Sequence, residues 1–268
     1  MKKRLITAAI GLTLLAVLLF LLDTLVFDVA VILFNVVALY EVLYVTKYVK
    51  YLPLVGISAV YTVIAPFIYM GYIPVDINSL NVVYVMILFI APLIKHEVVQ
   101  PQEVAFTFTM SMLLSYAFSC FSLVAHQKHG LFFLMFALNC AWISDAGAYF
   151  IGSAFGKHKL APKISPHKTI EGAIGGVLSS IVVTVLLVLI YPRVFDPSWE
   201  GSMLRLILFT ALLSVVGIIG DLTASYLKRS AGLKDFGNIM PGHGGVMDRF
   251  DSLLVIMPLV YVTLEFNH

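Results

Sequence analysis

Four aspartates near the ends of apolar segments could together bind a divalent cation. Asp248 and Asp251 lie three residues apart in "MDRFD", a spacing that puts two side chains on one face of a helix. Asp145 in "WISDAGAYF" and Asp221 in "GIIGDLTASYLKR" lie near the ends of two other apolar runs. Carboxylates gathered in one place repel one another, and hard cations such as Mg²⁺ take oxygen ligands of this kind. The sequence therefore predicts a Mg²⁺ site with these four aspartates as candidate ligands, and it leaves a second cation open.

Basic side chains and glycines close to these acids could bind phosphate. The glycines of "PGHGG" and "EGAIGG" allow a backbone to approach a ligand closely. Acidic residues for a metal beside basic residues for phosphate are the groups that phosphoryl or nucleotidyl transfer needs. The sequence has neither a G-x-x-x-x-G-K-[ST] loop nor a G-x-G-x-x-G after a strand, which argues against a P-loop or Rossmann site. The candidate donors to phosphate are Lys168, Lys228, Arg229, Lys234 and Arg249.

Long apolar segments must position these residues. Of the 268 residues, 60% are hydrophobic and only 12% are charged, which predicts an all-α polytopic membrane protein and excludes a soluble domain. Apolar runs of about 17 to 25 residues are long enough to cross a bilayer as helices. We predict about nine transmembrane helices, at Leu5–Leu22, Leu25–Tyr44, Leu52–Met70, Val82–Ile94, Val104–Ala125, Leu131–Ile151, Ile170–Tyr191, Met203–Leu222 and Ser252–Phe266.

The distribution of basic residues predicts the orientation of these helices. With the N-terminus in the cytoplasm, every Lys and Arg except Lys128, Arg193 and Arg205 falls on the cytoplasmic side. The four aspartates then lie at the cytoplasmic level of three different helices. We expect an N-terminal transmembrane region, 1–125, with about five spans. The remainder, 126–268, is expected to be catalytic and to carry two cytoplasmic loops, 152–169 and 223–249.

Each acidic residue also has a structural interpretation. Asp251 could simply stabilise the start of the ninth helix. Glu41, near the inner end of the second span, is expected to reach water, with a catalytic role as the less favoured interpretation. Buried acids can also be the carriers of a cation-coupled transporter. Their position at one membrane face, instead of at mid-membrane, argues against that alternative.

Two stretches resemble the signature of the phosphatidate cytidylyltransferases, also called CDP-diglyceride synthases. In "SYLKRSAGLKDFGNIMPGHGGVMDRFD" the one departure is Met240, where the family has Leu, Ile or Phe. Upstream, "SPHKTIEG" is similar to a second family element, with His167 in place of a lysine, and "SDAGAYFIG" is family-like around Asp145. The matching signature positions are Ser225, Lys228, Arg229, Lys234, Asp235, Gly237, Pro241, His243, Gly244, Gly245, Asp248, Arg249 and Asp251.

The resemblance implies an enzyme of the cell (inner) membrane that transfers the cytidylyl group of CTP to phosphatidic acid. The products would be CDP-diacylglycerol and pyrophosphate, Mg²⁺ would be required, and nucleic acid would not be a partner. Another CTP-dependent lipid enzyme, such as a polyprenol kinase or an ether-lipid cytidylyltransferase, is the alternative, and a homodimer is left open. The implied catalytic residues are Asp221, Asp248, Lys228 and Arg249. The implied substrate-binding residues are Ser165, Lys168, Glu171, Ser225, Arg229, Lys234, His243, Gly244 and Gly245.

The implied roles within this site differ from residue to residue. Asp221 and Asp248 would hold the metal, Asp145 a second cation, and Asp251 would be a ligand or would orient one. A phosphate monoester dianion is already a nucleophile near neutral pH, so no strong base is needed. His243 is therefore expected to bind a phosphate or to shape its loop.

Overall fold

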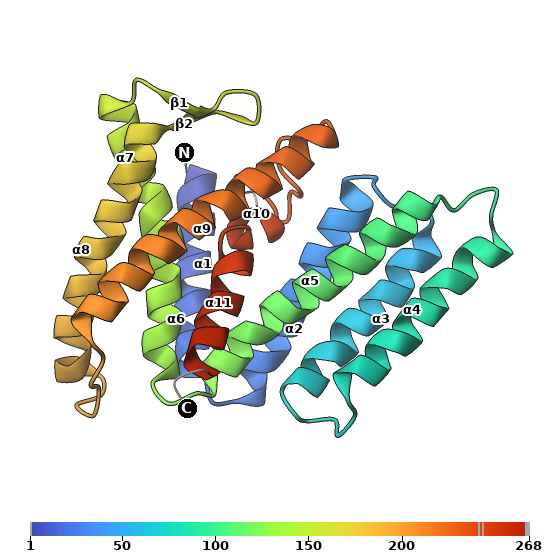
Figure 1. Ribbon diagram of the computed structural model, residues 1–268, viewed down its shortest axis with the longest axis horizontal. Coiled ribbons are helices and arrows are strands. Elements are labelled where there is room, and N and C mark those ends of the chain that lie inside the picture. Colours follow the sequence, from blue (N-terminus) through green and yellow to red (C-terminus); the bar gives the residue numbers. More distant parts are fainter. Residues whose placement is uncertain (1, 241, 243, 266–268) are drawn as a thin grey trace. The chain divides into compact units, whose positions relative to one another are not determined.

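The structure, a computed structural model, describes residues 2–240, 242 and 244–265, and most of these residues are helical (Figure 1). Among the residues described, seven helical segments are long and apolar enough to cross a membrane: Leu25–Val45, Leu52–Tyr69, Ile77–Ile94, Pro101–Ala125, Gly130–Phe155, Ile170–Val194 and Met203–Ser230. The prediction of an all-α, polytopic membrane protein is confirmed. Two shorter apolar helices, Ala9–Phe20 and Leu253–Glu265, complete the set, so the count of nine spans stays a prediction.

Packing divides the chain into two compact units. The first unit contains the residues up to Leu123 together with Ser230–Phe250. Its helices are α1 (Lys2–Phe20), α2 (Leu25–Tyr40), the π-helical turn η1 (Glu41–Val45), α3 (Leu52–Tyr69), α4 (Ile77–Ile94), most of α5 (Pro101–Ala125), and α10 (Met247–Phe250). The signature loop, which we define as residues 231–250, therefore packs with the N-terminal helices. The division of function between 1–125 and 126–268 stays a prediction.

The second unit contains Val124–Arg229 and the residues from Asp251 onward. Its helices are α6 (Gly130–Leu138), the π-helical turn η2 (Asn139–Ile143), α7 (Ser144–Phe155), α8 (Ile170–Val194), α9 (Met203–Ser230) and α11 (Leu253–Glu265). Between α7 and α8 lies a two-stranded antiparallel hairpin of β1 (Lys159–Ala161) and β2 (Ser165–Thr169), in which Lys159 pairs with Thr169. Within the residues described, β1 and β2 form the only sheet.

Glycines bring α7 and α8 together in the second unit. A Cβ placed on Gly172 would lie 2.7 Å from the carbonyl oxygen of Ala148, and one on Gly176 would lie 2.5 Å from the carbonyl oxygen of Ser144. Lipid tails are as apolar as leucine side chains, so membrane helices associate through such close backbone packing. The glycines of "EGAIGG" are thus required by the contact between two helices, whatever they contribute to a ligand.

The two largest differences from the predicted helix boundaries are at the start of α4 and the end of α9. Helix α4 begins at Ile77 instead of Val82, because the Asp76 carboxylate caps it by accepting a hydrogen bond of 3.1 Å from the Ser79 amide. Helix α9 continues to Ser230 instead of ending at Leu222, so the predicted loop 223–249 is helical over its first part. Gly232, with a φ of 71°, then adopts the left-handed backbone conformation that commonly follows a helix.

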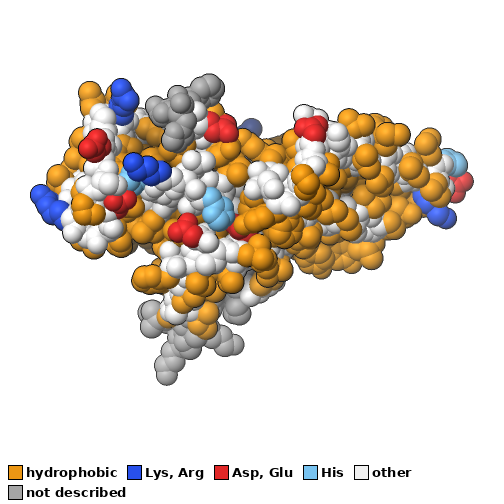
Figure 2. Space-filling model, turned by 90° about the horizontal axis from the view of Figure 1, so that it is seen from below, with side chains coloured by type: hydrophobic (Ala, Val, Ile, Leu, Met, Phe, Trp, Pro, Cys, Tyr) orange, Lys and Arg blue, Asp and Glu red, His pale blue; other side chains and the backbone are white. Residues whose placement is uncertain are grey.

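The exposed surface of the helices is strongly apolar. Figure 2 shows hydrophobic side chains over most of the visible face, with charged side chains in scattered positions. Leu93 on α4, for example, is 79% exposed. Large apolar side chains exposed along whole helices are stable in lipid and not in water, which agrees with a multi-pass membrane protein.

Candidate active site

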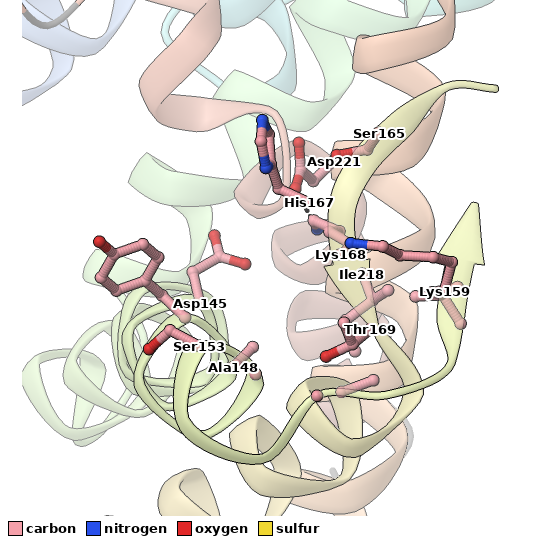
Figure 3. Close-up of a pocket in the computed structure, with 15 residues that line it drawn as sticks. Asp145, Ala148, Ser153, Lys159, Ser165, His167, Lys168, Thr169, Ile218 and Asp221 are labelled. Atoms are coloured by element: carbon pink, nitrogen blue, oxygen red, sulfur yellow. Dashed lines mark ion pairs between the residues drawn. The ribbon is translucent and has the colours of Figure 1, made fainter. Parts of the chain in front are cut away.

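A pocket of about 520 Å³ lies in the second unit, between the hairpin and helices α7, α8 and α9 (Figure 3). It brings together four residues that the sequence predicted to be functional: Asp145, Ser165, Lys168 and Asp221. The Asp145 carboxylate points into the pocket from α7, across from Lys168 and Asp221 (Figure 3). Residues far apart in the sequence therefore supply acidic and basic groups to one cavity.

Lys168 and Asp221 form an ion pair in this pocket. The Lys168 Nζ contacts the Asp221 Oδ2, and the two side chains are 23% and 19% exposed. Ser225, one turn further along α9, donates a hydrogen bond of 3.4 Å from its hydroxyl to the Asp221 Oδ1. Both oxygens of Asp221 thus have partners in the second unit. A ligand phosphate would compete with Asp221 for Lys168, and a cation would compete with Lys168 for Asp221.

A π-helical turn precedes Asp145. Turn η2 ends at Ile143, immediately before α7, and such widened turns within helices are frequent at functional sites. The Asn139 side chain, at the start of this turn, donates hydrogen bonds to the Ser180 carbonyl (3.0 Å) and to the Thr184 hydroxyl (2.9 Å) on α8. These buried contacts fix the helix that carries Asp145.

Asp251 interacts electrostatically with Asp221 and Asp145. Burial raises the pKa of the Asp251 carboxyl, and the negative charge of Asp221 raises it further, whereas Lys228 lowers it and Asp145 again raises it. Lys228 is itself only 8% exposed. Three carboxyl groups of the second unit therefore interact, and a cation placed among them would relieve their repulsion.

The acidic residues do not by themselves form a complete metal cage. Among the residues that the structure describes, no three His, Cys, Asp or Glu side chains are grouped closely enough to hold a metal ion. The prediction that Asp248 and Asp251 share one helix face is wrong, because α10 ends at Phe250 and Asp251 lies in the turn before α11. Mg²⁺ in enzymes commonly takes one or two carboxylates, with water and substrate phosphate as its other ligands. Asp221 with Asp251 or Asp145 fits that smaller set.

Asp248 has its described contacts in the first unit. Its Oδ2 accepts hydrogen bonds from the backbone amides of Phe236 (2.8 Å) and Gly245 (2.9 Å). Gly244, beside it, has a φ of 83°, a conformation that favours glycine. Asp248 therefore holds the signature loop together.

Glu41 also contacts the signature loop. Its carboxylate accepts hydrogen bonds from the amides of Val246 (3.1 Å) and Met247 (2.8 Å), and the residue is 0% exposed. The prediction that Glu41 reaches water is wrong, because these backbone donors stabilise the carboxylate inside the protein. The amides of Gly245, Val246 and Met247 thus all bind carboxylates of the chain itself, although we expected this loop to offer its backbone to phosphate.

The remaining predicted site and signature residues occupy varied positions. Glu171 does not line the pocket: it accepts hydrogen bonds from the amides of Lys157 (3.1 Å) and His158 (3.2 Å) and lies 2.5 Å from the His158 Nδ1, so it closes the base of the hairpin. Three basic residues are exposed, namely Arg229, Lys234 and Arg249. His243 and Pro241 lie outside the described residues.

The pocket also contains residues that the sequence interpretation missed. Tyr149 and Ser153 follow Asp145 at intervals of four residues on α7, so helical periodicity could have predicted that they share its face. Lys159 and Thr169 face each other in the hairpin and both line the pocket. Sequence spacing gave no signal for this pair, because the hairpin register depends on the turn between the strands.

Comparison with known proteins agrees with the family resemblance of the signature sequence. The pattern of the cytidylyltransferase family matches residues 2–267. The chain is 32% identical to a phosphatidate cytidylyltransferase of Bacillus subtilis over 269 residues, which cover 98% of this chain and 97% of the relative. It is 43% identical over 140 residues to a phosphatidate cytidylyltransferase of Staphylococcus haemolyticus, and this alignment covers 52% of each chain. In that alignment the chain spans about half the length of the relative. Since its whole described length is matched, the chain belongs to the cytidylyltransferase family.

Proposed function

We propose that this protein is a nucleotidyltransferase that transfers the cytidylyl group of CTP to phosphatidic acid, giving CDP-diacylglycerol and pyrophosphate. The observation that carries the proposal is the pocket in which the Lys168–Asp221 ion pair faces Asp145. The full-length similarity to a protein named phosphatidate cytidylyltransferase supplies the substrate class.

The proposed reaction requires the chain to align two phosphates. A phosphate oxygen of phosphatidic acid attacks the α-phosphorus of CTP, and the bond from that phosphorus to the β-phosphate oxygen breaks as pyrophosphate leaves. Lys168 would bind a substrate phosphate after exchanging its partner Asp221, and Lys228, Arg229 and Arg249 are the further candidates for phosphate contacts. Positioning and charge stabilisation account for most of the catalysis in reactions of this kind.

We propose Mg²⁺ as the cofactor. Bound Mg²⁺ neutralises phosphate charge and stabilises the leaving group. Asp221 and Asp251, with Asp145 as a ligand for a second cation, are the residues of the second unit that would hold it, and the raised pKa of Asp251 supports a cation near this group. Asp248 remains a candidate ligand from the signature sequence, in addition to its contacts within the loop.

The proposed setting is the inner cell membrane with the site at the cytoplasmic face. CTP is a cytoplasmic nucleotide, and the basic residues of loop 152–169 fall on the cytoplasmic side when the N-terminus does. A homodimer stays an untested prediction.

The experiment that tests the proposal supplies purified protein with CTP labelled at either the α- or the γ-phosphorus. We expect the α-label to enter a lipid product only when phosphatidic acid and Mg²⁺ are both present, with release of unlabelled pyrophosphate. Transfer of the γ-label to a polyprenol would instead identify a kinase. Preference for an ether lipid over phosphatidic acid in a competition assay would identify the other alternative.

A further inference from the structure

We propose that Glu41 is a positioning residue that holds the signature loop in its active conformation from the second helix. The effect on turnover rests on the proposed function, whereas the contacts that support the proposal do not. All residues involved belong to the first unit.

The Glu41 carboxylate has the geometry of a structural anchor. One oxygen accepts from the Val246 amide at 3.1 Å and the other from the Met247 amide at 2.8 Å, across 205 and 206 residues of sequence. A fully buried carboxylate is unfavourable unless donors compensate it, and hydrogen bonds to an ionised acceptor are stronger than neutral ones. The two backbone amides therefore compensate the burial of this carboxylate.

Two glycines of the signature leave space for the Glu41 carboxylate beside the loop. A Cβ on Gly237 would lie 2.2 Å from the Glu41 Oε1, and one on Gly245 would lie 2.3 Å from the same atom. Neither glycine has a positive φ, so backbone conformation alone does not require glycine at these positions. The space that the Glu41 carboxylate occupies does require it.

The contacts of Glu41 lie directly beside Asp248. Glu41 binds the two amides that precede Asp248, while Asp248 binds the amides of Gly245 and Phe236. At the far end of α10, the Phe250 ring packs against Phe34 of α2, with ring centroids 5.6 Å apart. Helix α2 with η1 therefore fixes α10 on both sides of Asp248. We infer that Glu41 sets the orientation of the Asp248 carboxylate and of the adjacent Arg249.

The first test compares Glu41→Gln with a matched control. Glutamine keeps the side-chain shape, but its amide group can accept at only one end and places an NH₂ against the second backbone donor. We expect kcat with CTP and phosphatidic acid to fall by about 10- to 100-fold, as for other residues that orient a catalytic group, with a smaller change in KM. Glu103 is the control, because its buried carboxylate also accepts from two backbone amides of the first unit, Lys50 (3.1 Å) and Tyr51 (3.4 Å), away from the signature loop.

A purely structural role predicts the same result for both variants. We expect Glu103→Gln to lower the Tm about as much as Glu41→Gln while kcat stays within about twofold of wild type. Equal kcat values for the two variants at equal Tm would overturn the proposal.

The second test does not depend on replacing Glu41 alone. Gly237→Ala places a methyl group against the Glu41 carboxylate, so it should lower kcat even though Glu41 remains present. In the Glu41→Ala background the same methyl group enters vacated space, and we expect little further loss. The double variant should thus be clearly more active than the product of the two single effects predicts. Full additivity would contradict the proposal. If the Glu41 variants do not fold, Gly237→Ala alone carries the test, and an unchanged kcat in that variant would overturn the proposal.

A third measurement separates this proposal from the proposed reaction. Hydrogen exchange in the segment 244–250, followed by mass spectrometry, needs no substrate. We expect it to be faster in Glu41→Gln than in wild type and unchanged in Glu103→Gln. Unchanged exchange in Glu41→Gln would overturn the anchor, whereas inactivity of wild-type protein on CTP would overturn only the proposed function.

Discussion

Asp221 and Asp248 were predicted from the sequence to have one role, but their contacts differ. Asp221 lies in the pocket, paired with Lys168, whereas the described hydrogen bonds of Asp248 close the signature loop. Substitutions of Asp221 and Asp248 should therefore change the stability of the protein to different extents, even where both abolish activity.

We expect Asp221→Asn and Asp248→Asn each to reduce the rate of cytidylyl transfer by at least about 100-fold, as loss of a metal ligand or key electrostatic group commonly does. Only Asp248→Asn should also lower the Tm clearly, because it weakens two partly buried hydrogen bonds to backbone. Thermal unfolding and label transfer on the same preparations test both statements. Asp76→Asn is the control, since asparagine also caps a helix, and it should change neither quantity. Near-normal turnover in both variants would contradict the assignment of these residues.

The raised pKa of Asp251 predicts a pH dependence of stability. A carboxyl group whose pKa is higher in the folded than in the unfolded protein binds more protons when folded, so it favours folding at low pH. The stability that protonated Asp251 contributes is lost as the pH rises from about 4, the ordinary pKa of an aspartate, through its raised pKa in the folded protein. In EDTA, the Tm of wild type should fall more between pH 5 and pH 8 than that of Asp251→Asn. Added Mg²⁺ should reduce this difference in Tm change between wild type and Asp251→Asn. Parallel pH profiles of the two proteins in EDTA would count against the interaction.

At the scale of elements, the contact between α7 and α8 places Asp145 across the pocket from the hairpin. Both helices are apolar, and their close approach depends on small residues. The sequence predicted both helices and the polar loop between them. It did not predict that the loop forms a hairpin, because the pairing of Lys159 with Thr169 depends on the turn between the strands.

Gly176→Ala tests this helix contact. Its Cβ would lie 2.5 Å from the Ser144 carbonyl oxygen, so α7 has to shift away and carry Asp145 with it. We expect a loss of about 1 to 3 kcal/mol in unfolding free energy, typical of overpacking, together with lower activity. Gly56→Ala on α3 is the matched control, because its Cβ would meet no atom within 4 Å. It should be neutral or slightly stabilising, as alanine is in a helix interior. Equal stability of the two variants would show that the helices can separate freely.

At the scale of the whole chain, composition and motifs predicted the helical membrane architecture and four of the fifteen residues that line the pocket. Asp145 and Asp221 were recognisable because charged residues are rare in apolar sequence, and Lys168 because it lies in a basic loop near these acids. Glu41 was recognisable as an acid near the end of an apolar run, but it was expected to reach water. Its contacts with Val246 and Met247 were not predicted, because no sequence pattern connects residues about 200 positions apart. For the same reason, the sequence did not predict that Ser230–Phe250 packs in the unit of the N-terminal helices.

The long-range hydrogen bonds of Glu41 have a consequence for biosynthesis. When the ribosome has added Glu41, it must add 205 further residues before the Val246 amide exists. At about 5 to 20 residues per second, this takes roughly 10 to 40 seconds. During that interval the nascent second helix carries a carboxyl group that lacks its final partners. Insertion of α2 into the lipid must therefore tolerate a protonated or water-contacting glutamate until the last part of the polypeptide emerges.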